Sequence, residues 1–61
     1  MNKWLKKLIG ELVKRGWEFE LTYDVYNNYV IKFVLYNFEP IVLTDDAPGL
    51  KRYYKELKAE K

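Results

Sequence analysis

Apolar residues near the start of the chain recur in pairs every four positions. They are Trp4, Leu5, Leu8, Ile9, Leu12 and Val13. On a helical wheel this spacing places them on one broad face, so residues 2–15 are predicted to form an amphipathic helix. Asn2 is suited to cap its N-terminus, and Gly16 stands where a left-handed residue commonly ends a helix.

The period of the pattern then changes from about four to two. Apolar and polar residues alternate through residues 17–25. In the second strand, residues 29–36, one face is expected to carry Tyr29, Ile31, Phe33 and Leu35, and the other Val30, Lys32, Val34 and Tyr36. This alternation is typical of strands with one buried face, and the asparagines at 27 and 28 suit a hairpin turn between them. A second turn at residues 37–40 and a short third strand at residues 41–44 follow.

The length of the first hairpin loop decides which side chains share a face. A two-residue loop would put Lys32 on the core face and turn Ile31 and Phe33 toward the acidic side chains of the first strand. An odd-length loop, such as residues 26–28 with its last residue left-handed, instead places Ile31 and Phe33 on the core face with Leu21. Burial of large apolar side chains outweighs the preference for two-residue loops, so we expect the odd loop.

A second helix is predicted after the third strand. Asp45 or Asp46 is the expected N-cap, and Pro48 is expected in the first turn. Apolar and aromatic side chains then follow the helical spacing i, i+3, i+4, i+7, at Leu50, Tyr53, Tyr54 and Leu57.

Two hairpins in series between two helices predict an α+β fold with the element order α-β-β-β-α. We expect a three-stranded antiparallel meander with both helices packed on one face, as a two-layer sandwich. Residues 1–61 are enough for one core and therefore one domain. The pattern leaves the register of the third strand open. The predicted core consists of Leu8, Leu12, Leu21, Ile31, Phe33, Tyr53 and Leu57.

The residue types that are missing argue against catalysis. The chain contains no cysteine, histidine, serine or glutamine, which removes disulfides, thiolate metal sites and the commonest general base. We therefore predict a non-enzyme without a cofactor or metal. No apolar run is long enough to span a membrane and no signal peptide is evident, so a soluble cytoplasmic protein is expected.

Charge is segregated along the chain. Residues 1–16 carry a net charge of +4 and residues 47–61 a net charge of +3, whereas residues 17–46 between them carry −5. This pattern predicts that the two helices form a basic side of the molecule. That side could bind nucleic-acid phosphates, or it could be an ordinary solvated surface. The candidate nucleic-acid-binding residues are Lys3, Lys6, Lys7, Lys14, Lys51, Arg52, Lys55 and Lys58.

The sheet face opposite the helices is the candidate protein-binding surface, because it combines acidic and apolar side chains. Its predicted members are Glu18, Glu20, Asp24, Val30, Lys32, Val34 and Tyr36. Its charge calls for a protein partner with a basic surface. Repulsion between its carboxylates and those of a second copy predicts a monomer.

The element order in a chain of 61 residues resembles that of double-stranded-RNA-binding-like domains. Gly16 and Trp17 at the end of the first helix also resemble the small HicA-type toxins of that class. Those toxins use a catalytic histidine, so the resemblance implies no RNase activity for a chain without one. Double-stranded-RNA-binding domains place a basic cluster at the start of the last helix, where this chain has Lys51 and Arg52, but they also carry a Gly-Pro-x-His loop that is missing here.

Several anti-CRISPR and other phage-encoded inhibitors are also this short and share the order helix, three strands, helix. Together with the acidic sheet face, this favours a non-catalytic inhibitor or adaptor of phage or mobile-element type that binds a protein. A nucleic-acid-binding domain is the first alternative. A designed or orphan scaffold without an evolved function is the second, because four residue types are missing.

Overall fold

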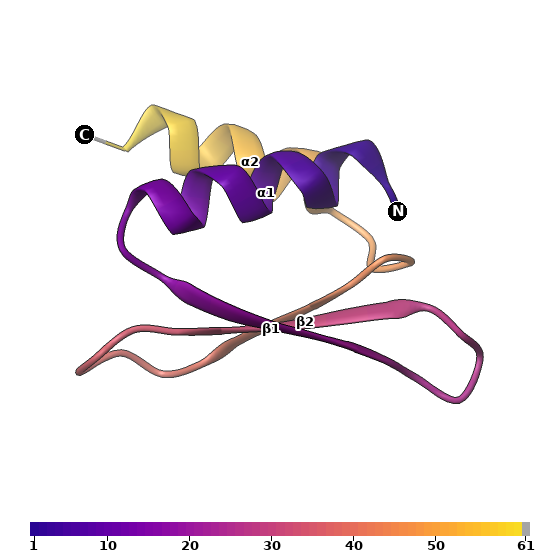
Figure 1. Ribbon diagram of the computed structural model, residues 1–61. Helices are drawn as coiled ribbons and strands as arrows, with labels where there is room; N and C mark the ends of the chain where they lie inside the picture. The colour runs from indigo at the N-terminus through magenta and orange to yellow at the C-terminus, as the bar shows by residue number, and fades with distance from the viewer. Residues whose placement is uncertain (61) are drawn as a thin grey trace.

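A computed structural model of the chain describes residues 1–60. Two helices and three strands follow one another in the order α1 (Lys3–Lys14), β1 (Glu18–Tyr23), β2 (Tyr29–Val34), β3 (Ile41–Thr44) and α2 (Leu50–Ala59). Both helices lie side by side on the same face of the sheet (Figure 1). The predicted α+β fold with a helical layer over a three-stranded antiparallel sheet is therefore confirmed.

The ends of α1 are formed as the sequence predicts. The side chain of Asn2 accepts a hydrogen bond from the backbone N–H of Trp4 at 2.8 Å, which satisfies one free donor of the first turn. Gly16 is left-handed with φ of 99°, and the next backbone N–H, that of Trp17, returns to the carbonyl of Leu12 at 3.0 Å. This glycine turns the chain out of the helix and toward the sheet.

The odd-length first hairpin is confirmed. β1 pairs antiparallel with β2 so that Leu21 lies opposite Ile31 and Phe19 opposite Phe33. Odd-numbered residues of both strands therefore share the face toward the helices, and Lys32 lies on the opposite face.

The position of the loop differs from the prediction by one residue. The loop comprises residues 25–27, and its left-handed residue is Asn27 with φ of 64°, not Asn28. The cause is Asp24, whose carboxylate accepts hydrogen bonds from the backbone N–H groups of Tyr26 at 2.8 Å and Asn28 at 2.9 Å. These bonds close the loop around Asp24 and lower the pKa of that carboxyl.

The second hairpin fixes the register that the sequence left open. β2 pairs with β3 so that Ile31 lies opposite Leu43 and Phe33 opposite Ile41. Asn37 takes the left-handed conformation in the turn, with φ of 70°. The sheet order is β1-β2-β3, which makes β2 the central strand.

The predicted start of α2 is wrong. Its N-cap is Gly49, left-handed at φ of 78°, which has no side chain to cap the helix. Pro48 lies in the preceding turn and not in the first turn of the helix. The helix therefore begins at Leu50, after the turn that brings the chain up from β3.

Neither Asp45 nor Asp46 caps α2, because both carboxylates are engaged elsewhere. The carboxylate of Asp45 accepts a hydrogen bond from the backbone N–H of Asn2, which ties the start of α1 to the end of β3. The carboxylate of Asp46 lies 3.3 Å from the side-chain amide nitrogen of Asn28 and so joins the end of β3 to the first hairpin loop.

The core lies between the helices and the central strand. Its buried residues are Leu5, Leu8, Leu12, Ile31, Phe33, Leu50 and Leu57. Five of the seven predicted core residues are among them, but Leu21 is 43% exposed and Tyr53 only partly buried. Leu21 points to the correct face, but it lies on the edge strand, which the helices leave largely uncovered. Leu5 and Leu50 complete the core in its place.

Candidate binding surfaces

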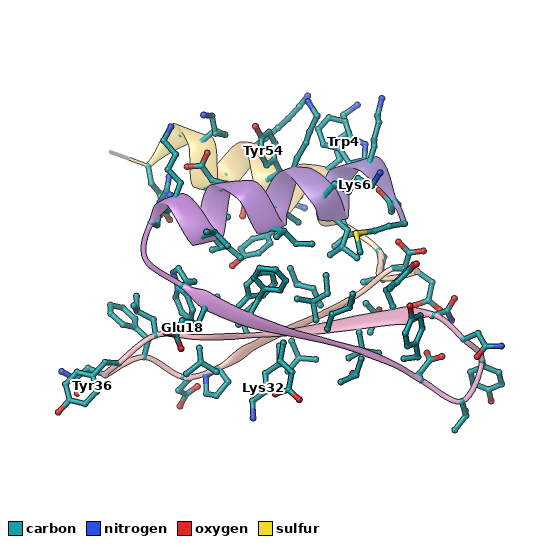
Figure 2. The ribbon with its side chains drawn as sticks, in the orientation of Figure 1. Trp4, Lys6, Glu18, Lys32, Tyr36 and Tyr54 are labelled. Carbon is teal, nitrogen blue, oxygen red and sulfur yellow. The ribbon has the colours of Figure 1, made fainter. Side chains whose placement is uncertain are left out.

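The face of the sheet that points away from the helices is uncovered. Figure 2 shows Lys32 projecting from this face, on the opposite side of the sheet from Trp4 and Tyr54. The strand residues on this open face are Glu18, Glu20, Thr22, Val30, Lys32, Val34, Val42 and Thr44. The register places Glu18 opposite Val34 and Glu20 opposite Lys32.

Five of the seven residues predicted for the protein-binding surface lie on the strands of the open face, and two lie in turns. Asp24 belongs to the hairpin loop, where its carboxylate is already occupied by hydrogen bonds. Tyr36 is exposed in the turn after β2, where it lines a surface depression together with Glu18 and Val34. Val42 was not predicted, although it lies opposite Lys32 and is 58% exposed. Its place follows only from the register of the second hairpin.

The carboxylates of the open face are unneutralised. Among residues 1–60, Glu18 and Glu20 form no ion pair, and both are exposed. Beside them Val34 is 45% exposed, and a shallow, open depression runs between these side chains and Lys32. The open face thus places exposed apolar area next to negative charge that could pair with a cation of a binding partner.

The outer side of the helical layer carries the opposite charge. The rings of Trp4 and Tyr54 lie 5.9 Å apart between centroids, and they join α1 to α2. The ammonium groups of Lys3 and Lys7 lie 5.3 Å from the centre of the Trp4 ring, and that of Lys51 lies 5.6 Å from it. We call these five residues the basic–aromatic cluster.

The predicted nucleic-acid-binding residues do not all gather at one place on the helices. All eight are exposed, but only three of them gather in the basic–aromatic cluster. Arg52 is paired with Glu56 at 3.2 Å, and Lys58 is paired with Glu11 at 3.3 Å. Positive charge at these two positions is therefore partly neutralised within α2 and between the helices.

The aromatic rings of the cluster support the fold. Trp4 and Tyr54 are partly buried and pack against the core, and so does Trp17 at the other end of α1. The ammonium groups of the cluster lie over the aromatic ring of Trp4, where cation–π attraction holds them. A ring whose faces are used in this way is a poorer platform for stacking a nucleotide base than a free ring.

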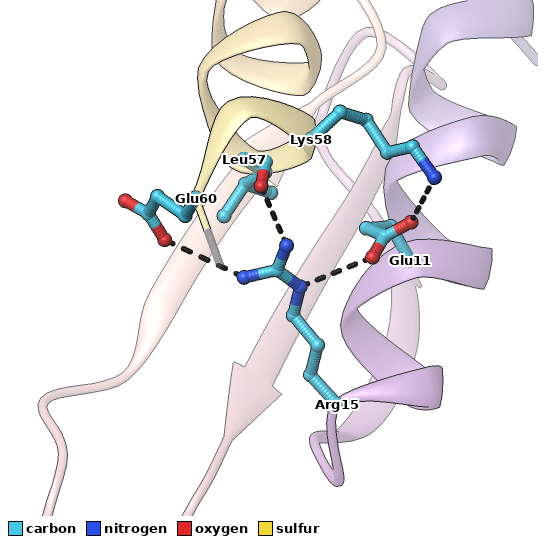
Figure 3. Close-up of polar contacts among 5 residues, drawn as sticks. All are labelled: Glu11, Arg15, Leu57, Lys58 and Glu60. Atoms are coloured by element: carbon cyan, nitrogen blue, oxygen red, sulfur yellow. Dashed lines mark hydrogen bonds and ion pairs between the residues drawn. The ribbon is translucent and has the colours of Figure 1, made fainter.

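An ion-pair network that the sequence does not predict joins the C-terminal halves of the two helices (Figure 3). Glu11, with a side chain only 10% exposed, is 3.1 Å from Nε of Arg15 and 3.3 Å from Nζ of Lys58. Arg15 also donates to the carbonyl of Leu57 near the end of α2 and lies 3.4 Å from Glu60. The hydrogen bond from Arg15, with a smaller contribution from Lys58, lowers the pKa of the Glu11 carboxyl below its ordinary value of 4.5.

Replacing Glu11 with glutamine is expected to destabilise the protein at neutral pH and to matter less in acid. Because the folded-state pKa is lowered, the carboxylate contributes stability above its unfolded-state pKa of 4.5, and this contribution is lost as the pH falls through the folded-state value. Thermal unfolding of both proteins between pH 7 and pH 2 measures the difference.

Glu56→Gln is the matched control, because Glu56 forms an i,i+4 pair with Arg52 whose side chains are 63% and 85% exposed. Such exposed pairs contribute little to stability. Equal effects of the two substitutions, or a Glu11 effect that does not change with pH, would show that the network does not hold the helices together.

The described part of the chain shows no arrangement of side chains that would mark a metal site. In residues 1–60 no group of three or more acidic, histidine or cysteine side chains is arranged to hold a metal ion. The surface depressions over these residues are open to solvent. Over the same residues, neither helix has the length and apolar character needed to cross a membrane.

Comparison with protein-family models, curated protein sequences and solved structures finds no match to this chain. The likeness to double-stranded-RNA-binding-like domains in element order is therefore not confirmed beyond the order itself.

Proposed function

We propose that the protein is a non-catalytic binding module that uses the open face of its sheet to hold a protein with a basic surface. The observation that carries the proposal is that one face of the sheet combines the exposed valines Val34 and Val42 with the carboxylates of Glu18 and Glu20, which form no ion pair within residues 1–60. Burying the valines would supply affinity, and the carboxylates would select a basic partner and speed association.

A heterologous partner fits this face better than a second copy. Stacking two open faces would bring Glu18 and Glu20 against the same residues of the symmetry mate, with only Lys32 nearby to offset them. Like charges in a desolvated interface are costly. The protein itself is therefore proposed to be a monomer.

In its biological role the module would act as an inhibitor or adaptor, of the kind that phages and mobile elements use, in the cytoplasm of the host. A chain without histidine, serine or cysteine is suited to act by occupying a surface and not by turning over a substrate.

Two charge-reversal variants of equal size test the proposal. The sheet variant combines Glu18→Lys and Glu20→Lys, and the helix variant combines Lys3→Glu and Lys7→Glu. We expect a partner captured from a host lysate by the wild type to be retained by the helix variant, and to bind the sheet variant at least about tenfold more weakly. Loss of the partner by the helix variant, with retention by the sheet variant, would contradict the proposal. Circular dichroism verifies that both variants fold.

Nucleic-acid binding through the helical side is the second candidate, because the basic–aromatic cluster gathers Lys3, Lys7 and Lys51 around Trp4. Such binding must weaken steeply as salt rises. Titration of duplex RNA and duplex DNA at several salt concentrations measures it. Micromolar, salt-sensitive binding that the helix variant loses and the sheet variant retains would favour this candidate over the first.

A further inference from the structure

β1 is an edge strand, and within residues 1–60 no strand pairs with its outer side. In an antiparallel ladder, alternate residues direct their backbone N–H and C=O groups toward opposite neighbours. The backbone N–H of Asp24 donates to the carbonyl of Asn28 at 3.0 Å, which places the even-numbered residues of β1 toward β2. The backbone groups of Phe19, Leu21 and Tyr23 therefore point outward, away from the sheet.

This edge is less protected than most strand edges. Proteins blunt their edges with proline, charged side chains (above all lysine), bulges or very short strands. β1 has six residues, contains neither proline nor lysine, and pairs with β2 without a bulge. The charged side chains within β1 are the glutamates at 18 and 20, which would repel an acidic strand but attract a basic one. The opposite edge, β3, has only four residues and directly follows Pro40. Of the two edges, β1 is therefore the one open to another strand.

The side chains of β1 present a different chemistry on each side of the strand. Phe19, Leu21 and Tyr23 lie on the face toward the helices and are 49%, 43% and 61% exposed. Glu18 and Glu20 lie on the open face, without a cation partner in residues 1–60. A strand added to this edge would meet apolar side chains on one side and carboxylates on the other.

We propose that β1 binds an extended segment of the protein partner as a fourth, antiparallel strand. The segment would alternate apolar residues, on the side of the helices, with lysine or arginine, on the open face. This inference rests on the proposed function and specifies how the basic partner docks. It also assigns a role to the exposed side chains of Phe19, Leu21 and Tyr23. Binding through the open face alone does not explain their exposure, because they lie on the other side of the sheet.

A second copy of the chain fits the edge less well. If two β1 strands paired about a two-fold axis with Leu21 opposite its mate, Phe19 would face Tyr23 and Glu18 would face Asp24. The latter pair, formed twice, would oppose like charges across the strands, and such pairs are destabilising. Basic residues at those positions of a partner strand would instead form pairs of opposite charge.

A synthetic seven-residue peptide that alternates lysine and valine, blocked at both ends, tests the inference. In hydrogen-exchange NMR, the amide protons of Phe19, Leu21 and Tyr23 are expected to exchange rapidly in the free protein and slowly in the complex. A peptide of the same composition, with its valines and lysines in separate blocks, should bind at least about tenfold more weakly.

Backbone methylation provides the sharpest control. In the proposed register the valines lie opposite Phe19, Leu21 and Tyr23, so their N–H groups point toward β1 and those of the lysines point away. N-methylation of the valines should abolish binding, and N-methylation of the lysines should leave it largely intact. Equal loss with both peptides would overturn strand addition.

Two further outcomes would overturn the inference, and they bear differently on the proposed function. If the three amide protons are protected without peptide and sedimentation equilibrium shows a dimer, a second copy occupies the edge. If the peptide protects none of them while a lysate partner is still lost by the sheet variant, the open face binds its partner without strand addition. In that case the proposed function stands and only this inference fails.

Discussion

Replacing Phe33 with alanine is expected to lower the free energy of unfolding by about 3–5 kcal/mol. Phe33 lies on the central strand, is fully buried, and is among the largest buried side chains. Its removal would leave a cavity beneath both helices and remove the aromatic contact with Phe19, whose ring centroid is 6.3 Å away. Since small domains have only a few kcal/mol of stability to lose, the variant is expected to be largely unfolded.

The control is Val34→Ala at the next position of the same strand. Val34 lies on the open face and is 45% exposed, so its truncation should cost less than about 1 kcal/mol. Urea denaturation, followed by tryptophan fluorescence and circular dichroism, measures the free energy of unfolding of both variants. Equal losses at the two positions would mean that the first hairpin has the opposite parity.

Replacing Leu5 with alanine is expected to cost about 2–5 kcal/mol, and replacing Leu21 with alanine less than about 1 kcal/mol. Leu5 is fully buried on the inner face of α1, whereas Leu21 is half exposed on the edge strand although it points to the helical side. A comparison of the losses of stability in these two variants therefore shows which strands the helical layer covers.

The same denaturation experiment measures this pair, because the two variants remove the same number of atoms from the same residue type. A larger loss for Leu21 than for Leu5 would contradict the described packing. It would mean that the helices cover the side of β1 that carries Phe19, Leu21 and Tyr23.

Much of the fold could be predicted because local pattern and burial agree. The paired spacing of apolar residues predicts α1 to within one residue at each end. In the first hairpin, only an odd-length loop places Ile31 and Phe33 on the core face. The free energy gained by burying these two side chains outweighs the preference for a two-residue loop. Most of the open face followed from that parity, since Glu18, Glu20 and Val34 alternate with buried or half-buried positions.

The remaining features depend on contacts between residues that are far apart in the sequence. Asp45 is a good capping residue in isolation, but the neighbouring N-terminus of α1 takes its carboxylate. The burial of Leu5 in place of Leu21 depends on the lateral position of the helices, which alternation does not encode. Glu11 meets Lys58 only because α1 and α2 lie side by side, and no local signal shows this pairing.

The most direct test of the proposed function is to map where a captured basic partner touches the isotope-labelled protein by NMR. Val34 and Val42 report on the open face through their methyl groups, and Trp4 reports on the helical side through its indole N–H. We expect the valine methyl signals to shift or broaden as the partner is added, and the Trp4 signal to stay unchanged. A response at Trp4 with unchanged valine methyl signals would contradict binding through the sheet.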